Sequence, residues 1–130
     1  MNAIDQWHRI ALTRDAALLH DLLDPDAVFE SPVVHSPQRG REVCMAYLLG
    51  AMQVIGGDKF RYTGEWRNAG GAVLEFESEI DGISVNGVDI VRCTDDGQRI
   101  VHFKVMIRPL KAIEIVHRKM GEMLAKAGDR

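Results

Sequence analysis

One carboxyl group in this sequence lies among apolar residues, where such a group can do chemistry. Residues 85–110 alternate as two long strands joined by an Asp-Gly turn, a pair typical of tight hairpins. Because side chains alternate along a strand, Asp89 shares a face with Val91, Phe103 and Val105. Burial there should raise the pKa of the carboxyl, so that it stays neutral and donates a hydrogen bond. We therefore predict that Asp89 is the polar anchor for an oxygen atom of a ligand.

A histidine in the loop over 32–39 is the second residue with suitable chemistry. His35 follows Ser31 by four positions, so it should lie near the mouth of the same interior. An imidazole titrates near neutral pH and can serve as a base, with Asp89 or a water completing the arrangement. Two simpler interpretations stay open: His35 is an exposed loop histidine, and Asp89 is satisfied by the Trp7 N–H or a backbone group and binds nothing.

The walls around Asp89 should combine apolar surface with a few hydroxyl and indole groups. Aromatic side chains bury large apolar areas, and a buried indole N–H needs an acceptor. The residues expected to contact a ligand are Trp7, Ser31, Tyr47, Trp66, Phe76, Val91, Phe103 and Val105. Tyr47 offers either a hydroxyl or simply part of the wall.

The spacing of apolar residues predicts the elements that must position these groups. Periodicity indicates helices over 4–11, 16–23 and 41 to about 52, strands over 27–31, 60–67, 73–80 and within 85–110, and a last helix from Pro109. Asp15 is a suitable N-cap for the second helix. The expected class is α+β: a cone-shaped, curved antiparallel sheet wrapped around the N-terminal helices, with an additional C-terminal helix.

Two surfaces of this arrangement are candidates for contact with a second subunit: the apolar side of the last helix and the outer face of the sheet. The last helix has an apolar side, which includes Val116 and Met120. This side either covers the mouth of its own domain or docks on a second subunit. Partial cover of its own domain is the favoured alternative. Glu75, Glu77 and Glu79 point away from the core side of their strand. The outer sheet face is therefore solvated or faces a subunit, and we expect a homodimer through it.

Length and composition set the broad class. With 130 residues the chain should form one domain over 1–130, and 46% hydrophobic with 27% charged residues is ordinary for a globular protein. A net charge of −3 gives no basic patch for nucleic acid. Apolar runs are too short for a membrane span, and the first residues lack the apolar core of a signal peptide. We therefore expect a cytoplasmic protein with neither a nucleic-acid nor a membrane partner.

No metal or cofactor motif emerges from the spacing of the ligand-forming residues. The histidines are scattered, without a paired spacing on one helix face: His8, His20, His35, His102 and His117. The short glycine pairs indicate turns and not a phosphate-binding loop. No metal site and no cofactor are expected.

Two segments resemble a known family. They are F-E-S-P-V-V-H-S-P-Q-R-G-R at 29–41 and V-D-I-V-R-C-T-D-D-G-Q-R-I at 88–100, separated by a helix and a meander of strands. Over residues 4–108 the chain resembles the nuclear-transport-factor-2-like (cystatin-like) superfamily, and within it the SnoaL-like and ketosteroid-isomerase-like cone folds. The resemblance implies a cone with an apolar pocket. It does not by itself imply one activity, because this fold hosts enzymes and non-enzymes.

The resemblance to the isomerases can be followed at three positions. Their pattern has a tyrosine in the first helix, where this chain has Trp7, and a general-base aspartate before the proline of the first strand, where it has Ser31. The aspartic acid of the long strand is present as Asp89. A serine hydroxyl is not a base near neutral pH, so steroid isomerase activity is not expected.

Two classes of function remain, beside a weaker third interpretation, a purely protein-interacting dimer that uses the outer sheet face. The first is a protein that binds a small apolar molecule in the cone pocket with Asp89 as polar anchor. The second is a small isomerase, cyclase or hydrolase that uses Asp89 and His35 on an apolar carbonyl or epoxide compound. Whether the protein is an enzyme is left open by the sequence.

Overall fold

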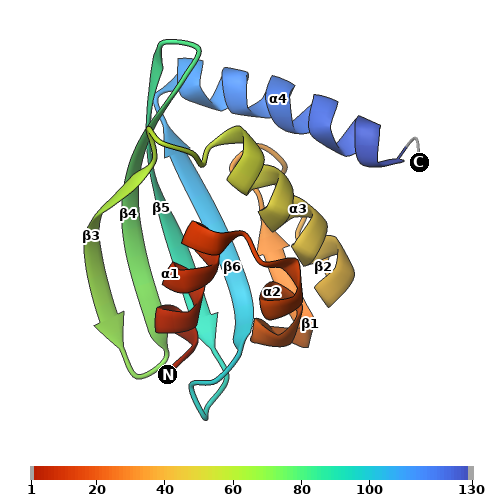
Figure 1. The fold of residues 1–130 in the computed structure, drawn as a ribbon, viewed down its shortest axis with the longest axis vertical. Coiled ribbons are helices and arrows are strands. Elements are labelled where there is room, and N and C mark those ends of the chain that lie inside the picture. Colours follow the sequence, from red (N-terminus) through yellow and green to blue (C-terminus); the bar gives the residue numbers. More distant parts are fainter. Residues whose placement is uncertain (1, 129–130) are drawn as a thin grey trace.

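The fold is a curved sheet with three helices on one face and a long helix across one end (Figure 1). The computed structural model describes residues 2–128. Its elements, in chain order, are α1 (Ala3–Thr13), α2 (Ala16–Leu22), β1 (Leu23–Glu30), β2 (Gln38–Arg39), α3 (Arg41–Val54), β3 (Arg61–Asn68), β4 (Gly71–Ile80), β5 (Ile83–Cys93), β6 (Ile100–Arg108) and α4 (Leu110–Gly128). The predicted α+β class is confirmed.

The sheet has the strand order β2-β1-β6-β5-β4-β3. Neighbouring strands run antiparallel except β1 and β6, which run parallel, so the sheet is mixed where a wholly antiparallel one was expected. Parallel neighbours need a long crossover connection, and here the chain between β1 and β6 supplies it with α3 and three other long strands. β1 therefore extends the hairpin of β5 and β6 at the edge that β4 does not occupy.

Local sequence signals explain where several elements begin and end. The Asp15 side chain accepts a hydrogen bond from the Leu18 N–H at 3.1 Å, which confirms it as the N-cap of α2. β1 begins at Leu23 and not at residue 27, because Leu23 already pairs with Ile100 before the register shifts. The turn between β4 and β5 is the two-residue pair Asp81-Gly82, with φ angles of 50° and 79°, as a type I′ hairpin requires.

A β-bulge in β3 changes which side chains face the helices. Tyr62 pairs with Phe76 of β4, but Gly64 pairs with the next residue, Glu75, so Thr63 is the extra residue. One extra residue inverts the alternation beyond it. Tyr62 therefore faces the helices, whereas Trp66 lies on the outer face and is 61% exposed. The prediction that Trp66 lines the pocket is wrong for this reason.

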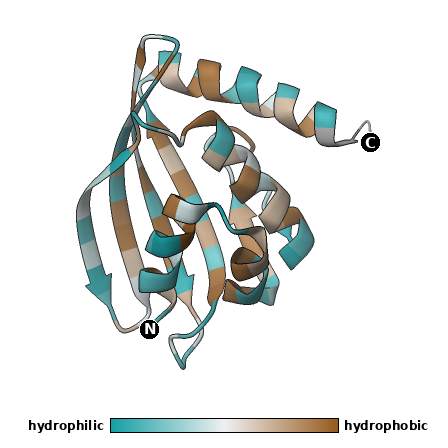
Figure 2. Ribbon diagram, viewed as in Figure 1, coloured by the Kyte–Doolittle hydropathy of each residue, from teal (hydrophilic) through white to brown (hydrophobic). Residues whose placement is uncertain are grey.

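The core lies between the sheet and the helices, and α4 closes one end of it. Figure 2 shows hydrophobic residues alternating with hydrophilic ones along the strands and along α4. Ala112, Ile115 and Val116 of α4 are buried, and the helix contacts α3, β5 and β6. α4 therefore partly covers its own domain, as expected. Within residues 2–128 no helix combines the length and apolar character needed to cross a membrane.

Candidate functional site

Asp89 lies on the inner face of the sheet, as predicted. It pairs with Leu74 of β4 and Val105 of β6, both buried, and is itself only 5% exposed. β5 pairs with β4 without interruption from Ile83 to Arg92, so strict alternation carries Asp89 inward. A carboxyl group is thus held in the centre of the sheet among apolar neighbours.

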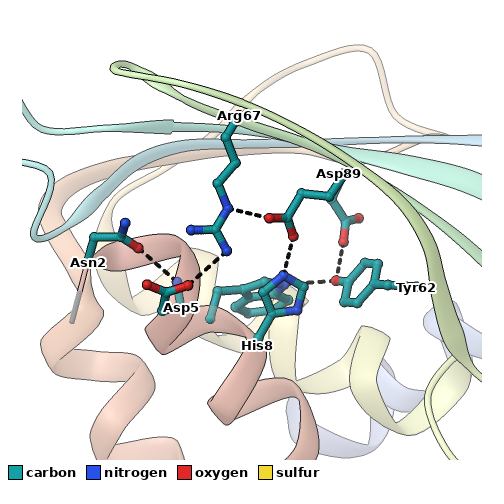
Figure 3. A network of polar contacts seen from close by, with 8 residues as sticks. Asn2, Asp5, His8, Tyr62, Arg67 and Asp89 are labelled. Atoms are coloured by element: carbon teal, nitrogen blue, oxygen red, sulfur yellow. Dashed lines mark hydrogen bonds and ion pairs between the residues drawn. The ribbon is translucent and has the colours of Figure 1, made fainter.

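A tyrosine hydroxyl occupies the position between Asp89 and Trp7. The Tyr62 hydroxyl donates a hydrogen bond to Asp89 Oδ2 at 2.6 Å and accepts one from Trp7 Nε1 at 2.8 Å (Figure 3). The three residues come from β3, β5 and α1. The Trp7 N–H is therefore connected to Asp89 only through the Tyr62 hydroxyl. The structure has no direct hydrogen bond from Trp7 to Asp89, which was the simpler interpretation.

The second carboxylate oxygen of Asp89 is available to a ligand. No residue among 2–128 donates a hydrogen bond to Oδ1. Every polar side-chain atom in that range that is fully enclosed by protein does have a hydrogen-bond partner. Oδ1 is therefore not enclosed by protein, and Asp89 is one of the residues that line a cavity. This oxygen is where a molecule in the cavity can form a hydrogen bond.

Burial sets the protonation chemistry of the pair. Loss of solvation raises the pKa of Asp89 to about 7, although the hydrogen bond from Tyr62 acts in the opposite direction. Burial, together with the charge of Asp89, raises the pKa of Tyr62 well above its ordinary value. Tyr62 therefore remains a donor throughout the physiological range, whereas Asp89 exchanges its proton near neutrality and can act as a donor or an acceptor.

The cavity that Asp89 lines, hereafter the anchor cavity, has a volume of about 420 Å³. Trp7, Phe76, Phe103 and Val105, four of the residues expected to contact a ligand, contribute to its walls. Val91 is buried in the core and does not line it. Charged side chains of Arg14 and Asp58, both exposed, lie among the lining residues that also face solvent.

Ser31 and Tyr47 lie in a different cavity. This second space, hereafter the α4 cavity, has a volume of about 180 Å³ and lies between residues 31–34, α3 and α4. The Ser31 Oγ accepts hydrogen bonds from the N–H groups of Val33 and Val34 at 3.0 and 3.1 Å, which folds the loop back on itself. The structure therefore separates these two residues from Asp89, where the sequence placed all of them in one pocket.

His35 is not part of either cavity. It is exposed in the loop between β1 and β2, beyond the turn closed by Ser31. The prediction of an Asp89 and His35 pair is not supported, because His35 is exposed and lines neither cavity. The simpler interpretation, an exposed loop histidine, agrees with its placement.

Tyr62 is the site residue that the sequence reasoning missed. Its position two residues after the apolar Phe60 is a signal for an inward strand face, and a buried carboxyl group requires a donor. Nothing in the sequence, however, pairs the strand positions of Tyr62 and Asp89. A polar cluster lies nearby: His8 Nε2 is 2.6 Å from Glu65 Oε1, and Arg67 bonds Glu65 and Asp5. His8, Arg67 and Asp5 are labelled in Figure 3. The cluster fastens α1 to β3, the two elements that position Trp7 and Tyr62.

No group of three or more His, Cys, Asp or Glu side chains within the described part of the chain is arranged to hold a metal ion. The site therefore consists of a carboxyl group and its tyrosine in an apolar cavity. Such a carboxyl group can donate a hydrogen bond when neutral and accept one when ionised.

Comparison with known proteins gives matches to one family and one fold. Residues 4–103 match the family model of the SnoaL-like domain. A crystal structure described as a steroid delta-isomerase from Pseudomonas aeruginosa is 35% identical, with a TM-score of 0.90, over 98% of this chain and 93% of that chain. An uncharacterised bacterial protein with a cystatin-like fold from Silicibacter pomeroyi is 27% identical, with a TM-score of 0.84, over 92% and 83% of the two chains.

A more distant structure supports the fold alone. An NTF2-like protein of unknown function from Mesorhizobium loti is 20% identical over 82% of this chain and 88% of that chain, with a TM-score of 0.69. Among curated protein sequences, none gives a significant match.

Proposed function

Because this chain belongs to the SnoaL-like domain family of the nuclear-transport-factor-2-like superfamily, we propose that its anchor cavity binds a small apolar molecule bearing a single hydroxyl or carbonyl oxygen. Asp89 holds that oxygen. The observation that carries the proposal is the Asp89 carboxyl itself, with Oδ2 bonded to Tyr62 and Oδ1 without a donor among the described residues. Apolar walls favour a ligand with little polar surface.

Two protonation states of Asp89 suit two kinds of oxygen. As a neutral acid it donates to a carbonyl oxygen, and as a carboxylate it accepts from a hydroxyl group. Since burial raises its pKa to about 7, both states are populated near neutral pH. The ligand therefore needs no charge, and a ligand with its own carboxylate is disfavoured by like-charge repulsion.

A second candidate is catalysis of proton transfer on an apolar ketone. The observation in its favour is the P. aeruginosa protein described as a steroid delta-isomerase, at 35% identity, together with a carboxyl group that exchanges its proton near neutrality. Against that reaction, Ser31 replaces the isomerase base, and its hydroxyl lies in the α4 cavity. We therefore place binding first.

Binding can be tested with 2-naphthol, an apolar fluorescent probe with one hydroxyl group, titrated at about pH 8 into the wild type and Asp89→Asn. In the variant the amide oxygen accepts from Tyr62, so the NH₂ group faces the probe and the hydroxyl loses its acceptor. We expect affinity to fall about tenfold, the loss of one hydrogen bond. Naphthalene, which lacks the oxygen, should bind both proteins equally.

The matched control is Asp95→Asn, the same chemical change at an exposed position in the turn of the β5 and β6 hairpin. It should bind 2-naphthol as the wild type does. Equal affinity of wild type and Asp89→Asn would remove Asp89 as the anchor. Incubation with a β,γ-unsaturated 3-ketosteroid, followed by the ultraviolet absorbance of the conjugated product, separates the two candidates: turnover that Asp89→Asn abolishes would favour the enzyme.

A further inference from the structure

The α4 cavity has no role in the site described so far, yet its walls are almost wholly apolar. Phe29, Val33, Val116, Met120 and Leu124 contribute to them. Among the lining side chains the polar ones are Ser31, Tyr47 and His117. The Ser31 hydroxyl is already engaged by two backbone N–H groups. A space of about 180 Å³ with this lining suits a hydrocarbon and offers little to a charged group.

The two cavities adjoin. Ala51, Ile55 and Val105 line both of them, so these side chains form a shared wall. Ala51 and Ile55 lie one helical turn apart at the C-terminal end of α3, and Val105 faces them from β6. Ala51 contributes only a methyl group, the smallest of the three side chains in this wall.

We propose that the anchor cavity and the α4 cavity form one bipartite site for an elongated amphipathic molecule. Its head bears a single neutral oxygen, hydroxyl or carbonyl, at Asp89, and its hydrocarbon tail passes Ala51 into the α4 cavity. The proposal rests on the proposed function, and it narrows the ligand class from a small apolar molecule to one with an alkyl chain. The helix α4 then acts as a wall for the tail and sets how long a tail can be.

The glycine at position 121, an exposed residue of α4, provides a place to add bulk beside the α4 cavity. Gly121 is one of the lining residues, and a Cβ added there meets no atom within 4 Å. It lies on the same side of α4 as His117 and Leu124, four residues before and three after it. Both alanine and leucine are better helix formers than glycine, so Gly121→Leu adds bulk and Gly121→Ala is its matched control.

The experiment compares para-ethylphenol with para-octylphenol, which share a head and differ in tail length. In the wild type, methylenes that enter the α4 cavity should each improve affinity up to about fourfold. We expect Gly121→Leu to leave the dissociation constant of para-ethylphenol within about twofold and to weaken para-octylphenol by at least about tenfold. Gly121→Ala should bind both probes as the wild type does. Ala51→Leu, which thickens the shared wall, should also weaken the long probe more than the short one.

A direct readout comes from methionine methyl groups, because Met52 lines the anchor cavity and Met120 lines the α4 cavity. With ¹³C-methyl methionine, both phenols should shift the NMR signal of Met52, and only para-octylphenol should shift that of Met120. Para-octylphenol that leaves Met120 unshifted, or that binds Gly121→Leu and wild type equally, overturns the bipartite site. Failure of the anchor itself has a different signature: para-ethylphenol affinity that is unchanged in Asp89→Asn.

Discussion

At the scale of single residues, the Tyr62 hydroxyl joins three elements through two hydrogen bonds. It donates to Asp89 at 2.6 Å and accepts from Trp7 at 2.8 Å. Each partner is buried, at 5% and 4% exposure. The cost of removing the hydroxyl is therefore the cost of leaving a buried N–H and a buried carboxyl with one partner fewer.

The substitution Tyr62→Phe tests the contribution of these two hydrogen bonds. We predict a loss of about 2 kcal/mol in the free energy of unfolding, measured by urea denaturation. The pKa of Asp89 should rise further, because the hydrogen bond from Tyr62 holds it down. Tyr47→Phe is the control: Tyr47 lines the α4 cavity, and its hydroxyl has no hydrogen-bond partner among the described residues, so the change should cost less than about 0.5 kcal/mol. Equal losses in the two variants would contradict the assigned role.

Asp89 could be located from the sequence, whereas its partner could not. Alternation carries Asp89 inward because β5 pairs with β4 without a break around it. The identity of the donor depends on how β3 and α1 approach β5, which is a matter of tertiary packing and leaves no local pattern. His35 was misplaced for a related reason, since the direction of its loop is set by the hydrogen bonds of Ser31.

At the scale of elements, the bulge at Thr63 decides on which face of the sheet Trp66 lies. Before it, Tyr62 faces inward; beyond it, Glu65 pairs with the buried Leu74, and Trp66 faces outward. Without the extra residue, Trp66 would share the inner face with Tyr62, as the plain alternation of β3 predicted. A bulge has no reliable sequence signature, so helices and caps such as Asp15 could be predicted here, but the register of β3 could not.

Tryptophan fluorescence tests the bulge. Trp66→Phe leaves Trp7, which is 4% exposed, and we predict a blue-shifted emission that acrylamide quenches weakly. Trp7→Phe leaves Trp66, 61% exposed, and should show a red-shifted emission with a quenching constant several times larger. Similar quenching in both variants would mean that the alternation of β3 continues through Thr63 and that Trp66 points inward.

At the scale of the whole molecule, the buried carboxyl makes stability depend on pH. The pKa of Asp89 is about 7 in the folded protein and about 4 in an unfolded chain. Between these values the folded state holds a proton that the unfolded state has lost. Stability from this group is therefore fully present below about pH 4, falls as the pH rises to about 7, and is constant above it.

Asp89→Asn should remove that dependence. Three pH units at about 1.4 kcal/mol each give roughly 4 kcal/mol. We predict that the difference in unfolding free energy between Asp89→Asn and wild type moves in favour of the variant by that order between about pH 4 and pH 8. Other carboxyl groups titrate alike in both proteins, so their contributions to the difference in unfolding free energy cancel. Glu65 is an example: the hydrogen bonds from His8 and Arg67 outweigh its desolvation and lower its pKa.

Urea denaturation at several pH values measures this difference, with Asp95→Asn as the control that should follow the wild type. A difference between Asp89→Asn and wild type that stays constant from pH 4 to pH 8 would show that Asp89 is solvated in the folded protein. The anchor cavity would then lack the low polarity on which its proposed preference for neutral ligands depends.

The parallel pairing of β1 with β6 also bears on how the chain matures during synthesis on the ribosome. Strands β3 to β6 meet their partners in the order in which they emerge, but β1, made early, has its long neighbour only at residues 100–108. Until then β1 has only the two-residue strand β2 beside it, and its other edge is unpaired. The nascent chain therefore exposes an unpaired, apolar strand edge until β6 has been synthesised. Chaperones act on exposed surfaces of this kind in a growing polypeptide.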